Sequence, residues 1–514
     1  MGSRARIVAV VACIVTVGLV AAGMGAAAPK GRVVVALGSD TPTLDPQMHT
    51  ARMGIIVGWH IYDSLYDREP RTGRPIPGLA ESARAVAPTT WELKLRRNVR
   101  FHNGEPFDAE SVKFTIERVL DPEQKSPNRG EFGWIKSVEV VDSHTARLHT
   151  HKPYPLVEER LASGNLGMLP PKYVREKGGA ALAVNPVGTG PFRFVEWKKG
   201  DRLVLEANEQ YWKPAPAMKT LVFRVIPETA TQIAEILSGG VDIIRAVPPD
   251  QIPALEASPR VRVTTAKILR VVYLSMDAAG RASKTPVMDV RVRRAISHAV
   301  NVDEVMQKVL GGLAVRTNGA GMNPLAFGFD PEVKPYPFDA DRAKKLLAEA
   351  GYPNGFEITM NTYAGSIVSV EQVSQAVQGY LGRVGIRARI KHFEDVGQYL
   401  AQLRAGKMEG TVLQSWGYGS MFDADALYYI FFKRGQPYDY GTTDDLSGLV
   451  EEARSTIDPT KRRELYTRAQ RLIAEQAFWA PMYGQYAIEA ASTKLDYEAA
   501  SDEILRAFTA TWKQ

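Results

Sequence analysis

Short apolar runs, some continuous and some alternating with polar residues, predict strands through much of the first half of the chain. Residues 33–37 are all apolar and end at Gly38, as expected for a buried strand that leads into a turn. Period-2 alternation on both sides of Lys199-Gly200-Asp201 predicts a hairpin over 192–207. Similar patterns predict strands over 91–95 and 221–226 and a hairpin over 138–149, with helices over 53–66, 109–120 and 229–238, and a loop over 71–77.

From about residue 285 onward, helical and strand patterns alternate. Asp339 is placed to cap a helix over 340–350, and Gly351 follows at the position where a left-handed residue ends a helix. Further apolar periodicity predicts strands over 356–360, 386–393 and 411–416, separated by helices over 373–384 and 396–403. Strands that alternate with helices favour a mostly parallel sheet, so we expect an α/β fold here.

Residues 1–28 have the pattern of a secretory signal peptide. Arg4 and Arg6 form a basic start, residues 7–20 are apolar, and residues 21–28 are small apart from Met24. Cleavage after Ala27 is expected, which directs the protein to the periplasm. Two alternatives remain open: a retained membrane anchor, and a lipobox at residues 10–13 that would attach lipid to Cys13.

Composition narrows the class of protein. The chain has 514 residues, enough for two or three lobes. A net charge of +7 is mild for this length, and no run of Lys and Arg is interleaved with aromatics, so we expect no nucleic-acid partner. Cys13 is the only cysteine, which excludes a disulfide in the mature chain. We find no P-loop, G-x-S-x-G or H-E-x-x-H motif, and we therefore expect neither an enzyme nor a cofactor.

Five segments in a fixed order carry a resemblance to a known family. They are PGLAES with WELKLRRNVRFHNGEPF (77–82 and 91–107), NPVGTGPF (185–192), VRVRRAISHAVNVD (290–303), KKLLAEAGYPNGF (344–356) and the stretch 416–427. They resemble the extracytoplasmic solute-binding proteins of family 5, the receptors of ABC importers for peptides, nickel complexes and related solutes. Two departures are Ala83, where the family usually has Trp, and Asn98, where it usually has Gly.

The resemblance implies an α/β, periplasmic-binding-protein-like two-lobed clamp of the larger three-domain type. A discontinuous domain I is expected over 29–70, 186–280 and 478–514, with domain II over 71–185 and domain III over 281–477. The glycines of 188–191 are expected to form a crossover rather than a phosphate loop, since a Lys-Ser/Thr pair and a following helix are missing.

The segment 415–425 is the first candidate for ligand contact. In peptide-binding relatives, the resemblance implies that an Asp three residues after the Trp anchors the peptide amine, whereas this chain has Gly419 at that position. Asp423 is a possible substitute. Trp416 and Tyr418 are candidates for an aromatic wall, although packing beneath a strand end would explain them equally well.

Three further candidates come from loops. Arg129 lies on a polar loop and is able to meet a ligand carboxylate bidentately, although a lone surface arginine is the commoner case. Ser39 follows the first strand and is either a ligand contact or an ordinary turn residue. Tyr363 follows the strand over 356–360, at the end where open sheets bind ligands.

A histidine group offers a weaker alternative. His149 and His151 share one face of a predicted strand, and the hairpin places His144 nearby. The spacing matches no fixed ligand pattern, so a solvated hairpin is favoured and no metal site is expected.

These observations predict a substrate-binding receptor, monomeric, that closes over a peptide or peptide-like solute and delivers it to an ABC permease in the inner membrane. A receptor for an opine, a sugar or a metal chelate is the alternative. A periplasmic hydrolase would need a nucleophile and a base close together, for which the sequence has no motif, and a signalling role cannot be separated from transport by sequence alone.

Overall fold

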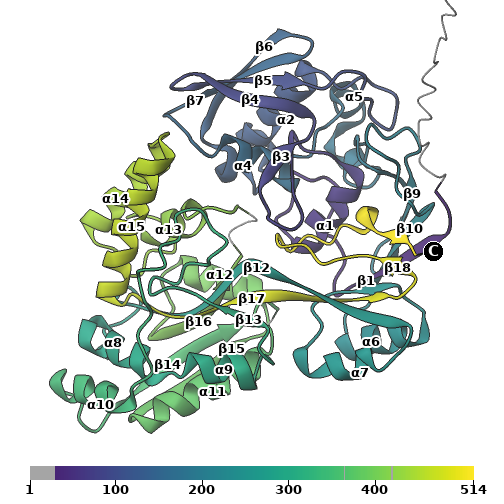
Figure 1. Ribbon diagram of the computed structural model, residues 1–514. Coiled ribbons are helices and arrows are strands. Elements are labelled where there is room, and N and C mark those ends of the chain that lie inside the picture. The colour runs from purple at the N-terminus through teal and green to yellow at the C-terminus, as the bar shows by residue number, and fades with distance from the viewer. Residues whose placement is uncertain (1–28, 364, 418–420, 514) are drawn as a thin grey trace, which may run out of the picture.

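The computed structural model describes residues 29–363, 365–417 and 421–513, and the chain forms two lobes around a shared sheet (Figure 1). We call residues 29–260 and 493–513 the first lobe, and residues 277–478 the second lobe. Two long strands, β12 (Val261–Met276) and β17 (Trp479–Ser492), run between them. The α/β, two-lobed architecture expected from the resemblance is confirmed. Division of the first lobe at residues 70 and 185 remains a prediction.

The largest sheet of the described residues has eleven strands and passes through both lobes. Its order is β15-β14-β16-β12-β17-β11-β1-β10-β9-β8, and β13 pairs with β17. Its other strands are β1 (Arg32–Leu37), β8 (Phe192–Lys198), β9 (Arg202–Ala207), β10 (Thr220–Val225), β11 (Ile243–Ile244), β13 (Ala314–Arg316), β14 (Phe356–Tyr363), β15 (Ile386–Phe393) and β16 (Thr411–Trp416).

β1 shows why this sheet is buried on both faces. Val33 and Val35 pack with helix α1 (Arg52–Ile61), whereas Val34 and Ala36 pack with α6 (Thr229–Ser238) on the opposite face. Successive side chains of a strand point to opposite faces, so a continuous apolar run is needed where helices cover both. The apolar run 33–37 therefore forms the central buried strand that its pattern predicts.

The antiparallel pair β12 and β17 joins the lobes, and its ends lie beside the domain boundaries expected at 280/281 and 477/478, although the pairing of these strands was not predicted. Its register shifts between Lys267 and Val271 and again between Val272 and Tyr273, close to where the pair enters the second lobe. An irregular stretch bends a strand and redirects its side chains. The segment 188–191, expected to form a crossover between the lobes, instead connects two parts of the first lobe. Gly188 N–H donates to His102 Nδ1 over 3.3 Å, and Thr189 Oγ1 donates to Asp63 over 2.9 Å.

A four-stranded antiparallel sheet, the two-stranded sheet β2–β3 and four α-helices form the upper part of the first lobe among the described residues (Figure 1). Asn98, in the turn after β5, has a φ of 62°, which explains how Asn stands where the family usually has Gly. The elements are β2 (Tyr66–Arg68), β3 (Pro75–Pro77), β4 (Ala80–Ala87), β5 (Thr90–Leu95), β6 (Ile135–Asp142), β7 (Thr145–Thr150), α2 (Ala109–Leu120), α3 (Arg129–Phe132), α4 (Val157–Leu161), α5 (Pro171–Leu182) and the 3-10 turn Gly164–Leu166, and α7 (Ile252–Glu256) lies farther along the chain.

The second lobe has the predicted parallel core. β14 pairs in parallel with both β15 and β16, and Asp339 caps α10 by accepting from Arg342 N–H. The helices are α8 (Val290–Ala299), α9 (Val302–Lys308), α10 (Ala340–Glu349), α11 (Val370–Arg383), α12 (Val396–Arg404), α13 (Asp425–Phe432), α14 (Asp444–Ser455) and α15 (Pro459–Gln476). A C-terminal segment returns to the first lobe, where β18 (Leu495–Asp496) pairs with β19 (Thr511–Trp512).

Two expected elements differ from the structure. The helix predicted over 53–66 ends at Ile61, because Tyr62 is extended and Asp63 turns inward to accept from Tyr211 and Trp212. Part of the loop predicted over 71–77 is strand β3, which pairs with β2. In both places, contacts with distant segments override the local pattern.

The two lobes touch each other at several points. The turn between β2 and β3 brings Gly73 against the ring of Phe422 from the second lobe, so closely that an added Cβ would lie 1.8 Å from Phe422 Cζ. Phe422 N–H donates to Glu159 over 3.4 Å, and Lys152 pairs with Glu451 over 3.4 Å. These contacts hold the lobes together around the space between them.

Candidate functional site

A cavity of about 960 Å³ lies between the lobes. This volume is in the range of small-molecule sites. Both lobes contribute to its lining, and the lining combines aromatic rings with charged groups. The aromatic residues are Trp59, Trp134, Tyr154, Tyr363, Trp416 and Tyr429, and the basic residues are Arg52, Arg68, His151, Lys152, Arg160, Arg270 and Arg454.

Helix α1 supplies one wall. Arg52, Ile55 and Trp59 follow each other at spacings of three and four residues, so they share the helix face that lines the cavity. Gly164 packs against this face, where an added Cβ would lie 2.6 Å from Trp59 Nε1. The absence of a side chain at Gly164 therefore lets the next residue, Asn165, approach α1 and line the cavity.

Two aromatic residues from adjacent strands form part of the opposite wall. Tyr363, at the end of β14, stacks on Tyr399 with ring centroids 4.1 Å apart and donates to the Ser415 carbonyl over 3.2 Å. Trp416, at the end of β16, donates its indole N–H to the Ala426 carbonyl over 3.0 Å. Their polar atoms are thus engaged within the protein, and they offer mainly ring surface to a solute.

A group of three charged residues lies between the lobes, at the irregular stretch of β12. Arg270 comes from the irregular stretch of β12 and donates to Glu503 over 2.9 Å and to Ser415 over 3.0 Å. Arg52 reaches the same Glu503 oxygen at 3.4 Å. We call Arg52, Arg270 and Glu503 the cavity cluster, in which two guanidinium groups share one carboxylate.

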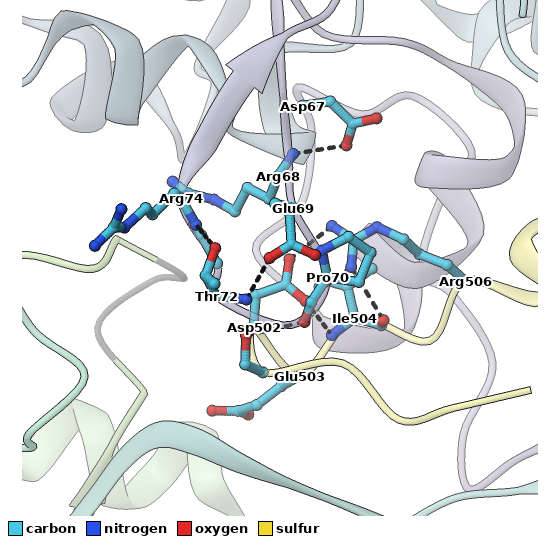
Figure 2. Close-up of polar contacts among 12 residues, drawn as sticks. Asp67, Arg68, Glu69, Pro70, Thr72, Arg74, Asp502, Glu503, Ile504 and Arg506 are labelled. Atoms are coloured by element: carbon cyan, nitrogen blue, oxygen red, sulfur yellow. Dashed lines mark hydrogen bonds and ion pairs between the residues drawn. The ribbon is translucent and has the colours of Figure 1, made fainter.

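The backbone of the C-terminal segment positions this carboxylate. Glu503 has a φ of 66°, a left-handed conformation that is uncommon for a residue with a side chain. Adjacent Asp502 and Glu503 point to opposite sides of the segment, as Figure 2 shows. Asp502 pairs with Arg506 at 2.6 Å beside the β2–β3 turn, while Glu503 faces Arg270. The strained conformation therefore directs Glu503 to the cluster.

Burial and neighbouring charges together set the pKa directions of Glu503 and Arg52. Burial raises the pKa of Glu503, but the attraction of Arg270 and Arg52 outweighs it, and the pKa is lowered overall. Burial lowers the pKa of Arg52, and Glu503 offsets this only in part because Arg270 and Arg245 repel the same guanidinium. The lowered pKa of Arg52 thus reflects burial first, which the Glu503 and Asp502 carboxylates do not fully offset beside two neighbouring arginines.

A second pair of arginines faces the cavity from opposite lobes. Arg160, on α4, donates to Tyr154 Oη over 3.2 Å and lies 3.6 Å from Glu131. Arg454, on α14, pairs with the buried Asp425 at 2.9 Å and lies over the ring of Tyr429. Each of these arginines has a carboxylate partner of its own, in contrast to those of the cavity cluster.

Only some of the predicted site residues line the cavity between the lobes. Tyr363 and Trp416 both line the cavity, and their ligand contact remains a prediction. Tyr418 and Gly419 lie outside the described residues. Ser39 is exposed on the turn after β1 and is not among the lining residues.

Arg129 and Asp423 also do not line the cavity. Arg129 is exposed, donates to the Leu120 carbonyl over 2.8 Å and borders a separate hollow of about 650 Å³. Asp423 is 3% exposed, and its two oxygens each accept from Arg462 over 2.6 Å. Its acceptor capacity is thus used inside the second lobe, which argues against the predicted substitution for an amine anchor.

Sequence reasoning missed Arg52, Arg270, Glu503 and Asn165. Arg52 at the start of an apolar helix carries a weak signal, because a charged residue on the buried face of such a helix needs a partner. Arg270 and Glu503 carried no local signal, since they meet only through the fold. His144, His149 and His151 were weighed as metal ligands. The described part of the chain contains no group of three or more His, Cys, Asp or Glu residues that could hold a metal ion.

Comparison with known proteins identifies the family. The model of the bacterial extracellular solute-binding proteins, family 5, matches residues 74–439. The chain belongs to this family. Among 29–363, 365–417 and 421–513, none of the helices combines the length and apolar character that crossing a membrane requires.

Relatives within family 5 cover almost the full chain. The glutathione-binding protein GsiB of Shigella dysenteriae is 28% identical over 500 residues, which is 94% of each chain. The periplasmic binding protein DppA of Helicobacter pylori, solved with the peptide STSA, has a TM-score of 0.81 at 27% identity and covers 94% of this chain and 98% of its own. MoaA of A. tumefaciens, solved with mannopinic acid, has a TM-score of 0.79 at 26% identity, with coverage of 94% and 100%.

Proposed function

We propose that this family 5 protein is the substrate-binding receptor of an ABC importer and captures a short peptide or peptide-like solute between its lobes. The observation that carries the proposal is the cavity between the lobes, in which aromatic rings and unbalanced arginines face each other. Rings accept the flat backbone and apolar side chains of a peptide, and arginines accept its carboxylate. The names of the related proteins, which include binders of glutathione and of a tetrapeptide, support this class of solute.

Capture by closure is part of the proposal. A solute that contacts both walls stabilises the closed arrangement relative to the open one, because the open form does not bring both walls to the solute at once. The close approach of Phe422 to Gly73 supports closure at this point between the lobes. Delivery to a permease in the inner membrane, rather than catalysis or signalling, is the proposed outcome, and the monomer is the proposed active form.

We also propose that residues 1–28 are a signal peptide removed after Ala27, which makes the mature protein periplasmic. N-terminal sequencing of exported protein is expected to give a start between Ala26 and Pro29. A lipid-bearing start at Cys13, or an intact Met1, would contradict it.

The test of the proposed function is identification of the bound solute. Protein purified from the periplasm is analysed by native mass spectrometry, stripped of ligand, and titrated by calorimetry with glutathione, a tetrapeptide, mannopinic acid, a neutral sugar and a nickel–histidine complex. Binding of glutathione or the tetrapeptide, with the solute recovered unchanged and with compaction in small-angle scattering, is expected. Exclusive binding of the sugar or the nickel complex, or conversion of the solute, would overturn the proposal.

A further inference from the structure

The cavity cluster has more positive charge than its own residues neutralise. Arg52 and Arg270 share one oxygen of Glu503, at 3.4 and 2.9 Å. Arg245 lies behind the cluster and donates to the Glu503 carbonyl over 3.2 Å, but it has its own carboxylate partner in Glu489 at 3.6 Å, so the surplus lies with Arg52 and Arg270. Buried charges in folded proteins are normally paired, so a surplus guanidinium that faces a cavity indicates an anionic partner that binds there.

Arg52 has donors to spare. A guanidinium carries five N–H donors. Among the described residues, the single polar contact of Arg52 is the ion pair with Glu503, whereas Arg270 also donates to Ser415. The side chain of Arg52 is 25% exposed and lines the cavity. Arg52 is therefore placed to offer two parallel N–H groups to a carboxylate in the cavity, which is the strongest geometry for this pair.

A neutral acceptor lies on the same wall. Asn165 is 7% exposed, and its Oδ1 has no hydrogen-bond donor in the described part of the chain. The preceding Gly164 packs against Ile55 and Trp59, which lie one and two turns along α1 from Arg52. Leaving a buried acceptor unpaired is destabilising, so its position in a cavity indicates an N–H donor on the solute.

We propose that Arg52, beside Arg270, binds a carboxylate of the solute, and that Asn165 Oδ1 accepts from an amide or ammonium N–H of the same molecule. The solute class is thus a peptide-like acid with a free carboxylate. This inference rests on the proposed function and adds the subsite and the group that it recognises. Glu503 limits the affinity of this subsite, because its own charge repels the incoming carboxylate.

The structure offers a simpler role for Arg52, namely to hold Glu503 in place. The two roles predict opposite results for Glu503→Gln. If Arg52 only serves to hold Glu503, the substitution loosens the cluster and weakens binding. If the cluster binds a carboxylate, removal of the competing charge strengthens binding by about 3- to 10-fold, while Arg52→Gln weakens it by about 10- to 150-fold through loss of a charge-assisted pair.

The experiment uses the mature, ligand-stripped protein and four probes. Calorimetry measures glutathione and trialanine against glutathione diethyl ester and trialanine amide, in which the carboxylates are blocked. A peptide digest of casein, untreated or methyl-esterified, is then offered, and captured peptides are identified by mass spectrometry. Wild type is expected to prefer the free acids at least tenfold. Arg129→Gln, outside the cavity, is the matched control and is expected to leave every affinity unchanged.

Each outcome decides between the claims. Equal binding of free and blocked probes, or unchanged affinity in an Arg52→Gln variant with wild-type melting temperature, overturns the carboxylate subsite and leaves the proposed function standing. Weaker binding by Glu503→Gln overturns the subsite in favour of the holding role. Capture of nothing from either digest, with no binding of any probe, overturns the proposed function and this inference together. Asn165→Ala is expected to weaken the free acids about 5- to 50-fold, and Asn165→Asp, which keeps an acceptor, is expected to retain binding of probes that carry an ammonium group.

Discussion

Two groups of buried charges differ in how their positive and negative residues match. One lies inside the second lobe and stabilises the fold, whereas the other lies at the cavity and is proposed to bind the solute. Asp423 and Arg462 are 3% and 4% exposed and match one to one, with two hydrogen bonds of 2.6 Å. In the cavity cluster, Arg52 and Arg270 compete for the single carboxylate of Glu503. The first group satisfies its own charges, whereas the second is balanced only when an anion is added.

The same contrast appears in how each group relates to the lobes. Asp423 and Arg462 both belong to the second lobe, so opening of the clamp leaves their pair unchanged. Glu503 and Arg52 belong to the first lobe, while Arg270 lies on the strand that enters the second and donates to Ser415 there. Opening of the clamp therefore changes the surroundings of the cavity cluster. We infer from its two arginines for one carboxylate, and from its position between the lobes, that this cluster is the solute-binding site.

The largest expected effect is on the one-to-one pair. Asp423→Asn leaves the buried Arg462 without its carboxylate, which is expected to lower the free energy of unfolding by about 3–5 kcal/mol. Denaturant titration measures the loss. The matched control is Asp444→Asn, whose pair with Arg434 is exposed and is worth less than about 1 kcal/mol. A loss below about 1 kcal/mol for Asp423→Asn would remove the distinction between the two groups.

The second prediction concerns closure of the two lobes, which affects the cavity cluster but leaves the Asp423–Arg462 pair unchanged. In Gly73→Ala the added Cβ meets the Phe422 ring, so the lobes are expected to close less completely and the solute to bind about tenfold more weakly, or about 1.4 kcal/mol. Gly104→Ala is the matched control: Gly104 also has a positive φ, of 91°, but an added Cβ there meets no atom within 4 Å.

Both glycine variants are expected to lose a similar, small part of their stability, since a side chain is strained at positive φ. Small-angle scattering of the liganded forms is expected to show a larger radius of gyration for Gly73→Ala only. Equal affinities for the two variants would show that the contact between Phe422 and Gly73 does not limit closure.

Much of the fold could be predicted from the sequence, because its signals are local. The helices over 340–350 and 229–238, the hairpin over 192–207 and the strand over 386–393 lie where apolar period, capping Asp339 and turn residues predict them. The two-lobed architecture was predicted from the five motif segments, through their resemblance to family 5. The joining pair β12 and β17 was missed as a unit, because its two strands lie more than 200 residues apart in sequence and become neighbours only in the sheet.

The site was less predictable for the same reason. The position of Trp416 and Tyr363 at the cavity could be predicted because a strand end is a local feature, whereas Arg52, Arg270 and Glu503 meet from three distant segments. Asp423 attracted attention through a motif whose carboxylate serves the second lobe itself. A sequence motif can mark residues that stabilise the fold. The residues that line a cavity for a solute can come from distant segments, and no local motif then identifies them.

The smallest expected effect is the change in stability with pH that comes from Glu503. It tests directly whether the two arginines of the cavity cluster keep this carboxylate charged. The pKa of Glu503 is lowered in the folded protein, so between its folded pKa and its ordinary value near 4.5 the unfolded chain binds more protons than the folded one. Stability from this group is therefore complete above about pH 5.5 and is lost as pH falls through the folded pKa. The difference in unfolding free energy between wild type and Glu503→Gln is expected to shrink over this window, by about 1.4 kcal/mol for each unit of pKa lowering. A constant difference for Glu503→Gln between pH 6 and pH 3 would mean that Arg52 and Arg270 do not hold its carboxylate charged.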